Sequence, residues 1–179
     1  CGSRWAGRFV VWLATNALSN LGTDGAGRDI CVSTDWTGGA GFVGSHLADR
    51  LLVEGHSVKV LDNFETGRAS NLAHHNDNVQ LELIQGSVLD IPLLEKVISE
   101  SDYVFHLAAA VGVFNIVNNP LSSLLTNIRG TENVLEASYK YSKEVFLTSS
   151  SEVYGKNTSD SLSENDDRIL GSPVTLRWS

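Results

Sequence analysis

The stretch TGGAGFVGSHL at residues 37–47 constrains the fold more than any other part of the sequence. Its glycines, Gly38, Gly41 and Gly44, recur at every third position, and apolar residues follow at helical intervals. The first glycine permits a tight turn, the second lets the backbone approach a pyrophosphate, and the third lets the helix pack closely on a sheet. The start of the helix also offers free N–H groups and a partial positive charge to phosphates. The stretch therefore predicts a strand-to-helix turn that binds a dinucleotide.

An acidic residue ends the strand predicted next. HSVKVLD at residues 56–62 is a short apolar strand that finishes at Asp62. A carboxylate there can accept a hydrogen bond from a ribose 2′-hydroxyl and would repel a 2′-phosphate, which favours NAD over NADP. Arg68 is nearby and could bind a 2′-phosphate, so NADP stays possible as the cofactor. The glycines taken alone are also compatible with a purely structural turn.

Strand and helix patterns alternate along the rest of the chain. The predicted strands cover 79–86, 102–110 and 144–151, and the predicted helices cover 91–100 and 120–141. This alternation is typical of α/β proteins, in which a doubly wound parallel sheet carries helices on both faces. A length of 179 residues fits one such domain.

The segment before the glycines fits this pattern poorly. A buried apolar strand is expected there, but the sequence is ICVSTDW, with Asp35 and Trp36 at its end. We therefore expect a divergent or poorly ordered segment at residues 1–36 and an incomplete dinucleotide-binding domain at residues 37–179. The sequence contains no methionine and begins at Cys1, so we expect a fragment or a processed product.

Composition argues against several classes of partner. A net charge of −8 disfavours binding to nucleic acid or to anionic membranes, and the apolar run at residues 8–19 is too short to span a bilayer. Two cysteines provide neither a disulfide framework nor paired metal ligands, which favours a reducing, cytoplasmic setting. The adjacent His74 and His75 lie in a polar stretch, HHNDN, which favours a solvated loop over a metal site.

Six motifs in order give the sequence a family resemblance. They are TGGAGFVGSHL, LDNFETGR, GSVLD, VFHLAAAVGV, NIRGTENVLEAS and TSSSEVYG, and the resemblance that they carry covers residues 37–179. In this order they resemble the extended short-chain dehydrogenase/reductase family, the NAD-dependent epimerases and dehydratases of nucleotide sugars. The resemblance implies a Rossmann-type fold cut before its substrate lobe, NAD as cofactor, a UDP- or dTDP-sugar as substrate and a homodimer in the full-length protein.

The same resemblance implies a set of cofactor contacts. The glycine turn and the two residues after it would contact the phosphates. Residues after the second and third strands would contact the ribose and the adenine, and residues after the fourth strand would lie along the dinucleotide. An asparagine on the following helix would lie behind the cofactor, although it could equally be a buried structural amide. In chain order these residues are Gly38, Gly41, Phe42, Val43, Gly44, Asp62, Asn63, Arg68, Ser87, Val88, Leu107, Ala108, Ala109 and Asn127.

The last motif, SSSEVYG, carries the implied catalytic residues. By position, Ser150 matches the family's catalytic Ser/Thr and Glu152 matches an acid/base position. The family oxidises the sugar at C4 to a 4-keto sugar, which leads to epimerisation, decarboxylation or dehydration. Sugar dehydratases of the family carry an acid where this chain has Ser151, so epimerase or decarboxylase chemistry is favoured. A 4,6-dehydratase and a non-catalytic dinucleotide-binding module stay open as alternatives.

One tyrosine–lysine pair has the spacing of a catalytic pair. YKYSK at residues 139–143 places Tyr139 four residues before Lys143, but it precedes SSSEVYG, whereas the family's pair follows that motif. We therefore interpret the spacing as coincidence. The resemblance puts the true pair directly after Ser179, so we expect this chain to be inactive alone.

Overall fold

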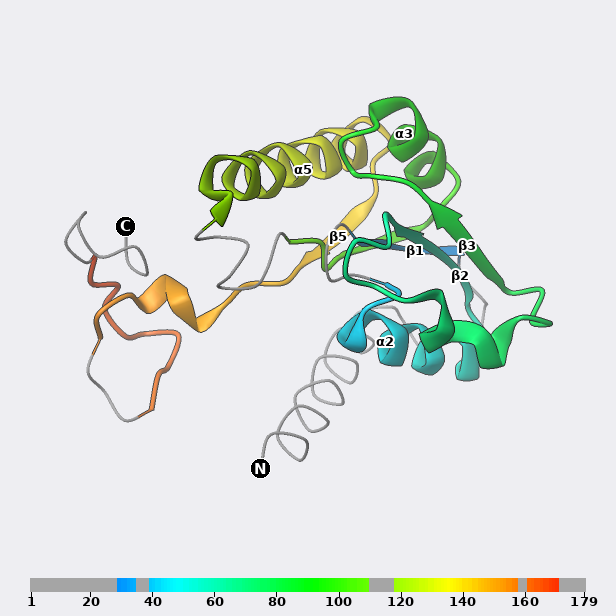
Figure 1. Cartoon of the computed structure of the whole chain (residues 1–179), viewed down its shortest axis with the longest axis horizontal. Coiled ribbons are helices and arrows are strands. Elements are labelled where there is room, and N and C mark those ends of the chain that lie inside the picture. The colour runs from blue at the N-terminus through cyan, green and yellow to red at the C-terminus, as the bar shows by residue number, and fades with distance from the viewer. Residues whose placement is uncertain (1–28, 35–38, 110–117, 158–160, 171–179) are drawn as a thin grey trace. The chain divides into compact units, whose positions relative to one another are not determined.

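The computed structural model describes residues 29–34, 39–109, 118–157 and 161–170. The chain divides into two units, with the boundary between Leu147 and Thr148. The first unit contains a parallel sheet and its covering helices (Figure 1). In chain order its elements are β1 (Asp29–Thr34), α2 (Phe42–Val53), β2 (Ser57–Asp62), the 3₁₀ helix η1 (Ala69–His75), β3 (Leu81–Gln85), α3 (Ile91–Ser99), β4 (Tyr103–His106), α5 (Pro120–Lys140) and β5 (Glu144–Leu147).

The strand order reverses beside β1. Among the described residues the five strands lie in the order β3-β2-β1-β4-β5, and every neighbouring pair is parallel. The chain thus builds outward from β1 through β2 to β3, then returns to place β4 on the other side of β1. This is the doubly wound α/β topology that the alternating pattern predicts, and the point of reversal is where such sheets bind ligands.

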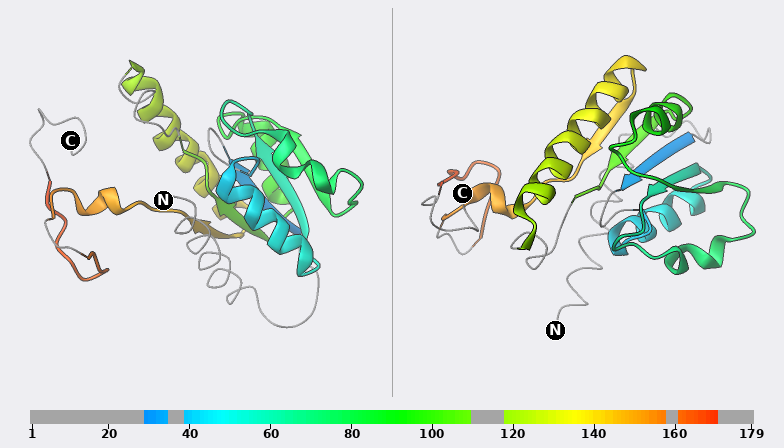
Figure 2. Two further views of the ribbon diagram at one scale, coloured as in Figure 1. Left: turned by 60° about the horizontal axis from the view of Figure 1, so that its bottom comes forward. Right: turned by 45° about the horizontal axis from the view of Figure 1, so that its top comes forward.

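Helices cover both faces of the sheet (Figure 2). On one face α2 and η1 enclose an apolar core that includes Leu47, Leu51 and Leu72. On the other face α3 and α5 enclose a second core that includes Leu94 and Val134. Successive residues of β2 point to opposite faces, so Val60 belongs to the first core and Leu61 to the second.

β1 lies inside the segment that the sequence sets apart at residues 1–36. Ile30 of this strand is fully buried and pairs with Val58 of β2 on one side and with Tyr103 of β4 on the other. Residues 29–34 therefore belong to the centre of the sheet. Residues 1–28, together with Asp35 and Trp36, lie outside the described part of the chain.

The end of α5 separates the tyrosine–lysine pair. The helix stops at Lys140, and Ser142 takes a left-handed backbone conformation with φ 54°. Lys143 therefore lies beyond the helix, and Tyr139 on its last turn is 89% exposed. The pair does not share a helical face, which agrees with the interpretation of its spacing as coincidence. In the described ranges, no helix is both long and apolar enough to cross a membrane.

Candidate functional site

The start of α2 faces the point where the strand order reverses. Gly41 precedes the helix with an extended backbone, φ −77° and ψ −176°, and its carbonyl accepts a hydrogen bond from the Ser45 N–H at 3.1 Å. In the described structure no side chain caps this helix end, and its first turn carries no acid. The N-terminal N–H groups and their partial positive charge therefore remain available to an anion. Gly38, the first glycine of the motif, lies outside the described residues.

Asp62 at the end of β2 holds this glycine turn in place. One carboxylate oxygen, Oδ2, accepts a hydrogen bond from the Ala40 N–H at 3.0 Å. The other, Oδ1, accepts one from the Phe64 N–H at 2.7 Å, and Phe64 has a left-handed φ of 59°. A single side chain thus joins the turn after β1 to the segment after β2.

The carboxylate of Asp62 is enclosed by this segment. The residue has no exposed surface, and a Cβ built on Gly67 would lie 2.6 Å from Oδ2. Only glycine at position 67 permits so close an approach. The carboxylate that is expected to hold the ribose is therefore enclosed by the backbone of its own segment.

The first turn of η1 also contacts the glycine turn. The Ala40 carbonyl accepts hydrogen bonds from the Arg68 N–H at 2.9 Å and from Asn71 Nδ2 at 2.8 Å. The Arg68 side chain is exposed, and Asn63 Oδ1 accepts a hydrogen bond from the Glu65 N–H at 3.1 Å. The predicted ribose neighbours Asn63 and Arg68 therefore lie on the same short segment as Asp62.

The predicted adenine neighbours follow β3 but differ in burial. Ser87 is half-buried, and its Oγ accepts a hydrogen bond from the Leu89 N–H at 3.1 Å. Val88 is 1% exposed, and its carbonyl accepts a hydrogen bond from Asn133 Nδ2 at 3.0 Å. Its side chain presses on α5 so closely that a Cβ on Gly130 would lie 2.7 Å from Cγ2. The Val88 side chain is thus part of the core rather than a surface open to a ligand.

The other side of the reversal is formed by the residues after β4. Leu107 is 7% exposed and packs in the first core, whereas Ala108 and Ala109 are half-buried. The Asn127 side chain, on α5, is also half-buried. Residues 107–109 and the glycine turn follow adjacent strands, β4 and β1, so they lie at the same edge of the sheet.

His106, the last residue of β4, is a buried neighbour of this edge. It is 1% exposed, and its Nε2 lies 3.1 Å from the Thr131 hydroxyl on α5. Burial lowers the pKa of its imidazole from 6.5 to about 4, because the protonated ring loses its hydration. His106 is therefore neutral at neutral pH.

The predicted catalytic residues belong to the second unit. Ser150 is exposed, and its carbonyl accepts a hydrogen bond from the Val153 N–H at 3.2 Å in the 3₁₀ helix η2 (Ser151–Tyr154). The side chain of Glu152 lies outside the described structure. Gly155 has a left-handed φ of 60° and contacts the Ile169 backbone so closely that a Cβ would clash with it. Tyr154 and Lys156 bond the same residue, Ile169, through their backbones.

Sequence reasoning did not identify four residues that build the first unit's site. Ala40, Phe64 and Asn71 form the hydrogen-bond links around the glycine turn, and Gly67 makes room for the carboxylate. Gly67 belongs to the motif LDNFETGR, so its position in that motif could have identified it as part of the site. The other three act through backbone groups or a generic amide, which leave no chemical pattern in a sequence.

Comparisons of sequence connect this arrangement to a known family. The model of the GDP-mannose 4,6 dehydratase family matches residues 36–173. A UDP-N-acetyl-alpha-D-glucosaminuronate decarboxylase from Bacillus cytotoxicus is 42% identical over 143 residues, which make up 80% of this chain and 44% of that protein.

Solved structures give the same result. A UDP-N-acetylglucosamine 4-epimerase from Methanobrevibacter ruminantium superposes with a TM-score of 0.72 at 33% identity, over 84% of this chain and 47% of that one. A dTDP-glucose 4,6-dehydratase from Streptomyces venezuelae, solved with NAD bound, superposes with a TM-score of 0.69 at 30% identity, over 76% and 45%. The chain thus spans less than half the length of each relative.

Proposed function

Because this chain belongs to the GDP-mannose 4,6 dehydratase family, among the extended short-chain dehydrogenase/reductases, we propose that it binds NAD and serves as the cofactor-binding part of an enzyme that modifies a nucleotide sugar. The observation that carries this proposal is the glycine turn at the reversal of strand order. There an uncapped helix start, held by Asp62, adjoins the carboxyl ends of β1 and β4.

The residues present at this edge fit a dinucleotide. The N–H groups at the start of α2 suit the pyrophosphate, with Phe42 and Val43 beside it. Asp62, Asn63 and Arg68 would hold the adenosine ribose, and the acidic charge of Asp62 favours NAD over NADP. Of the remaining predicted neighbours, Ser87 would lie by the adenine together with the backbone of Val88, whose side chain is in the core. Leu107, Ala108, Ala109 and Asn127 would lie along the cofactor.

The reaction proposed is an epimerisation or decarboxylation that passes through oxidation at the sugar C4. Bound NAD supplies the hydride acceptor. Ser150 would hydrogen-bond the sugar hydroxyl or ketone oxygen, and Glu152 would act as acid or base. Position 151 holds serine, which offers no carboxylic proton for removing water, and a decarboxylase is among the similar proteins. Both observations favour this reading over dehydration.

Two further properties belong to the proposal. A cytoplasmic setting is favoured by the two cysteines, which provide no disulfide framework. A homodimer that packs α5 of one copy against α5 of the other is favoured by the apolar side chains that this helix exposes, Leu121, Leu124 and Ile128 among them.

Titration of the 179-residue chain with NAD, followed by calorimetry, tests cofactor binding. We expect saturable binding with one NAD per chain. Gly41→Val should abolish it, because a branched side chain would occupy the space that the pyrophosphate needs. Gly55→Asn is the control at the other end of α2. Its φ of 87° strains any side chain, asparagine less than most, so it should lose some stability but keep the wild-type affinity for NAD. A folded chain that binds no NAD would contradict the proposal.

Incubation of the same chain with NAD and UDP-sugars tests catalysis. The sequence has one Tyr-x-x-x-Lys, at 139–143, and its lysine lies beyond the helix that carries its tyrosine. We therefore expect no turnover by this chain alone. Measurable product would show that another group here performs the proton transfer.

A further inference from the structure

Two histidines converge on one carboxylate on the α2 side of the sheet. Asp49 lies on α2, and His74 and His75 are the last residues of η1. His74 Nε2 lies 2.9 Å from Asp49 Oδ1, and His75 Nε2 lies 2.8 Å from the same oxygen. The prediction of a solvated loop at HHNDN was therefore wrong for these two residues, because they end a helix and contact α2.

The three donor atoms are close enough together for one metal ion to bind them all. The two ring nitrogens and the carboxylate oxygen all lie within 4.8 Å of one another. Ligands of tetrahedral Zn²⁺, at about 2.0–2.1 Å from the ion, lie about 3.3 Å from each other. Small side-chain shifts would thus open the present contacts to the separation that an ion between them requires.

The surroundings leave room for the remaining ligands. The side chain of His75 is 18% exposed, that of Asp49 32% and that of His74 55%, so water can reach one side of the cluster. His46, one turn earlier on α2, has its Nδ1 3.8 Å from Asp49 Oδ2. It lies beside the carboxylate oxygen that does not contact His74 and His75.

We propose that Asp49, His74 and His75 form a binding site for a divalent transition-metal ion such as Zn²⁺, with water completing its coordination. Two imidazoles and one carboxylate are a donor set that suits zinc, cobalt or nickel. The site is separate from the proposed cofactor site, because its ligands lie on the second half of α2 and the end of η1.

The position gives the ion a structural effect. The first turn of η1 already bonds the glycine turn through Arg68 and Asn71 to Ala40. A metal at the other end of η1 would fasten it to α2 as well. The segment that carries the proposed ribose contacts would then be held at both ends, and metal binding would stabilise the folded chain.

Titration of the metal-free 179-residue chain with Co²⁺, and competition by Zn²⁺, tests the site. We expect one ion per chain, visible absorption bands typical of nitrogen and oxygen ligands, and a higher melting temperature with Zn²⁺. Cys1 and Cys31 provide an internal check, since thiolate ligands would add a charge-transfer band in the near ultraviolet. That band, or the absence of saturable binding, would overturn the proposal.

Substitutions identify the ligands. His74→Gln and His75→Gln keep a side-chain donor for Asp49 but remove the ring nitrogen, so each should weaken Zn²⁺ binding by at least about tenfold. Asp77→Asn, which removes an exposed carboxylate on the turn after η1, is the matched control and should keep the wild-type affinity. Unchanged affinity in His75→Gln would overturn the proposal.

Discussion

At the scale of single residues, the Asp62 carboxylate has one structural role and one proposed ligand-binding role. Its oxygens accept hydrogen bonds from the Ala40 and Phe64 backbones, and it is the proposed acceptor for the ribose. The first role stabilises the folded chain before any cofactor binds. The position of an acid at the end of this strand is thus explained by the turn it holds as well as by the ligand it is proposed to bind.

Asp62→Asn separates these roles. An amide has one acceptor oxygen, so one of the two backbone N–H groups would face an NH₂ donor instead of an acceptor. We expect a loss of about 2–3 kcal/mol in the free energy of unfolding, measured by urea denaturation. The preference for NAD over NADP, measured by calorimetry, should fall by about tenfold, because the charge that repels a 2′-phosphate is gone.

The control for this change is Asp77→Asn, the same exchange on an exposed turn, which should alter neither quantity. Unchanged stability in Asp62→Asn would mean that its backbone contacts contribute little. Unchanged cofactor preference together with lost stability would assign Asp62 a structural role alone.

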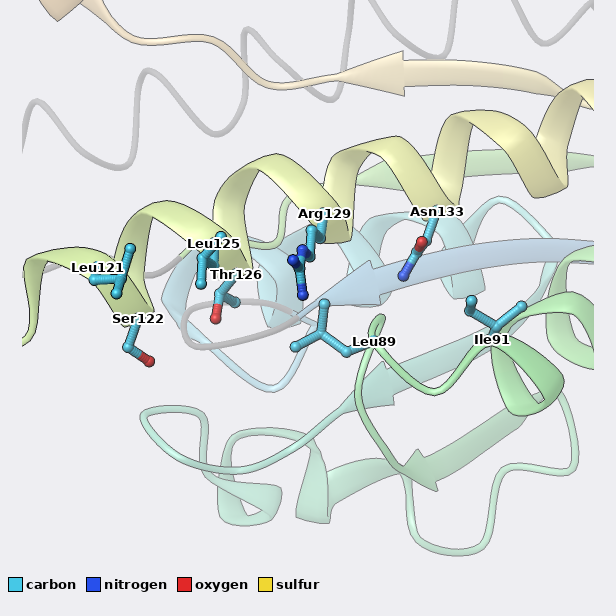
Figure 3. A pocket seen from close by; sticks show the side chains of 8 residues that line it. All are labelled: Leu89, Ile91, Leu121, Ser122, Leu125, Thr126, Arg129 and Asn133. Carbon is cyan, nitrogen blue, oxygen red and sulfur yellow. The ribbon is translucent and has the colours of Figure 1, made fainter.

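At the scale of elements, α5 presents two different faces. Val134 and Ala137 are buried against the sheet, whereas Leu121, Leu124 and Ile128 are 67%, 55% and 56% exposed. Side chains on this helix line a pocket of about 560 Å³ together with Leu89 and with Ile91, the first residue of α3. Figure 3 shows these side chains. Exposed apolar side chains repeated along one helix are typical of a surface that packs against another protein.

Leu124→Glu tests the proposed α5 contact between two copies. A charge in an apolar interface loses its hydration without gaining a partner, so we expect at least about tenfold weaker dimerisation. Analytical ultracentrifugation over a range of concentrations measures this. Val79→Glu, an equal change at a site that is 99% exposed in a turn, should leave the association unchanged. A wild-type chain that is monomeric at all concentrations would contradict the dimer proposal.

At the scale of the whole molecule, one buried histidine links stability to pH. The His106 pKa is lowered to about 4 by burial, whereas the unfolded chain protonates near 6.5. Between these values the unfolded state binds the additional proton, so acid favours unfolding. The contribution of His106 is complete above pH 6.5 and is lost as the pH falls towards 4.

Urea denaturation between pH 7 and pH 4 measures this effect. We expect His106 to account for a fall on the order of 3 kcal/mol in the free energy of unfolding. His106→Gln, which keeps a polar partner for Thr131 but does not titrate here, should remove most of that slope. Val104→Ala, a destabilised control with the histidine intact, should retain it. An equal slope in wild type and His106→Gln would contradict the assignment.

Much of the fold was predictable because its signals are local. Periodicity located the helices at residues 42–53, 91–99 and 120–140 and most strands to within a few residues, and the glycine motif located the turn. The α/β class and the family are confirmed. Solved relatives contain bound NAD, and NAD binding by this chain is the proposal that the calorimetric titration tests. The individual site residues, the boundary at residue 36 and the roles of Ser150 and Glu152 stay predictions.

The sequence alone determined the order of helices and strands and the residue types at the strand ends, because both depend on residues that are close together in the chain. Only the three-dimensional structure shows that β1 lies at the centre of the sheet, that Asp62 is enclosed between Ala40 and Gly67, and that His75 contacts Asp49. These contacts join residues more than twenty positions apart or depend on backbone groups that every residue carries. No local pattern encodes them, because they arise only when packing decides which segments meet.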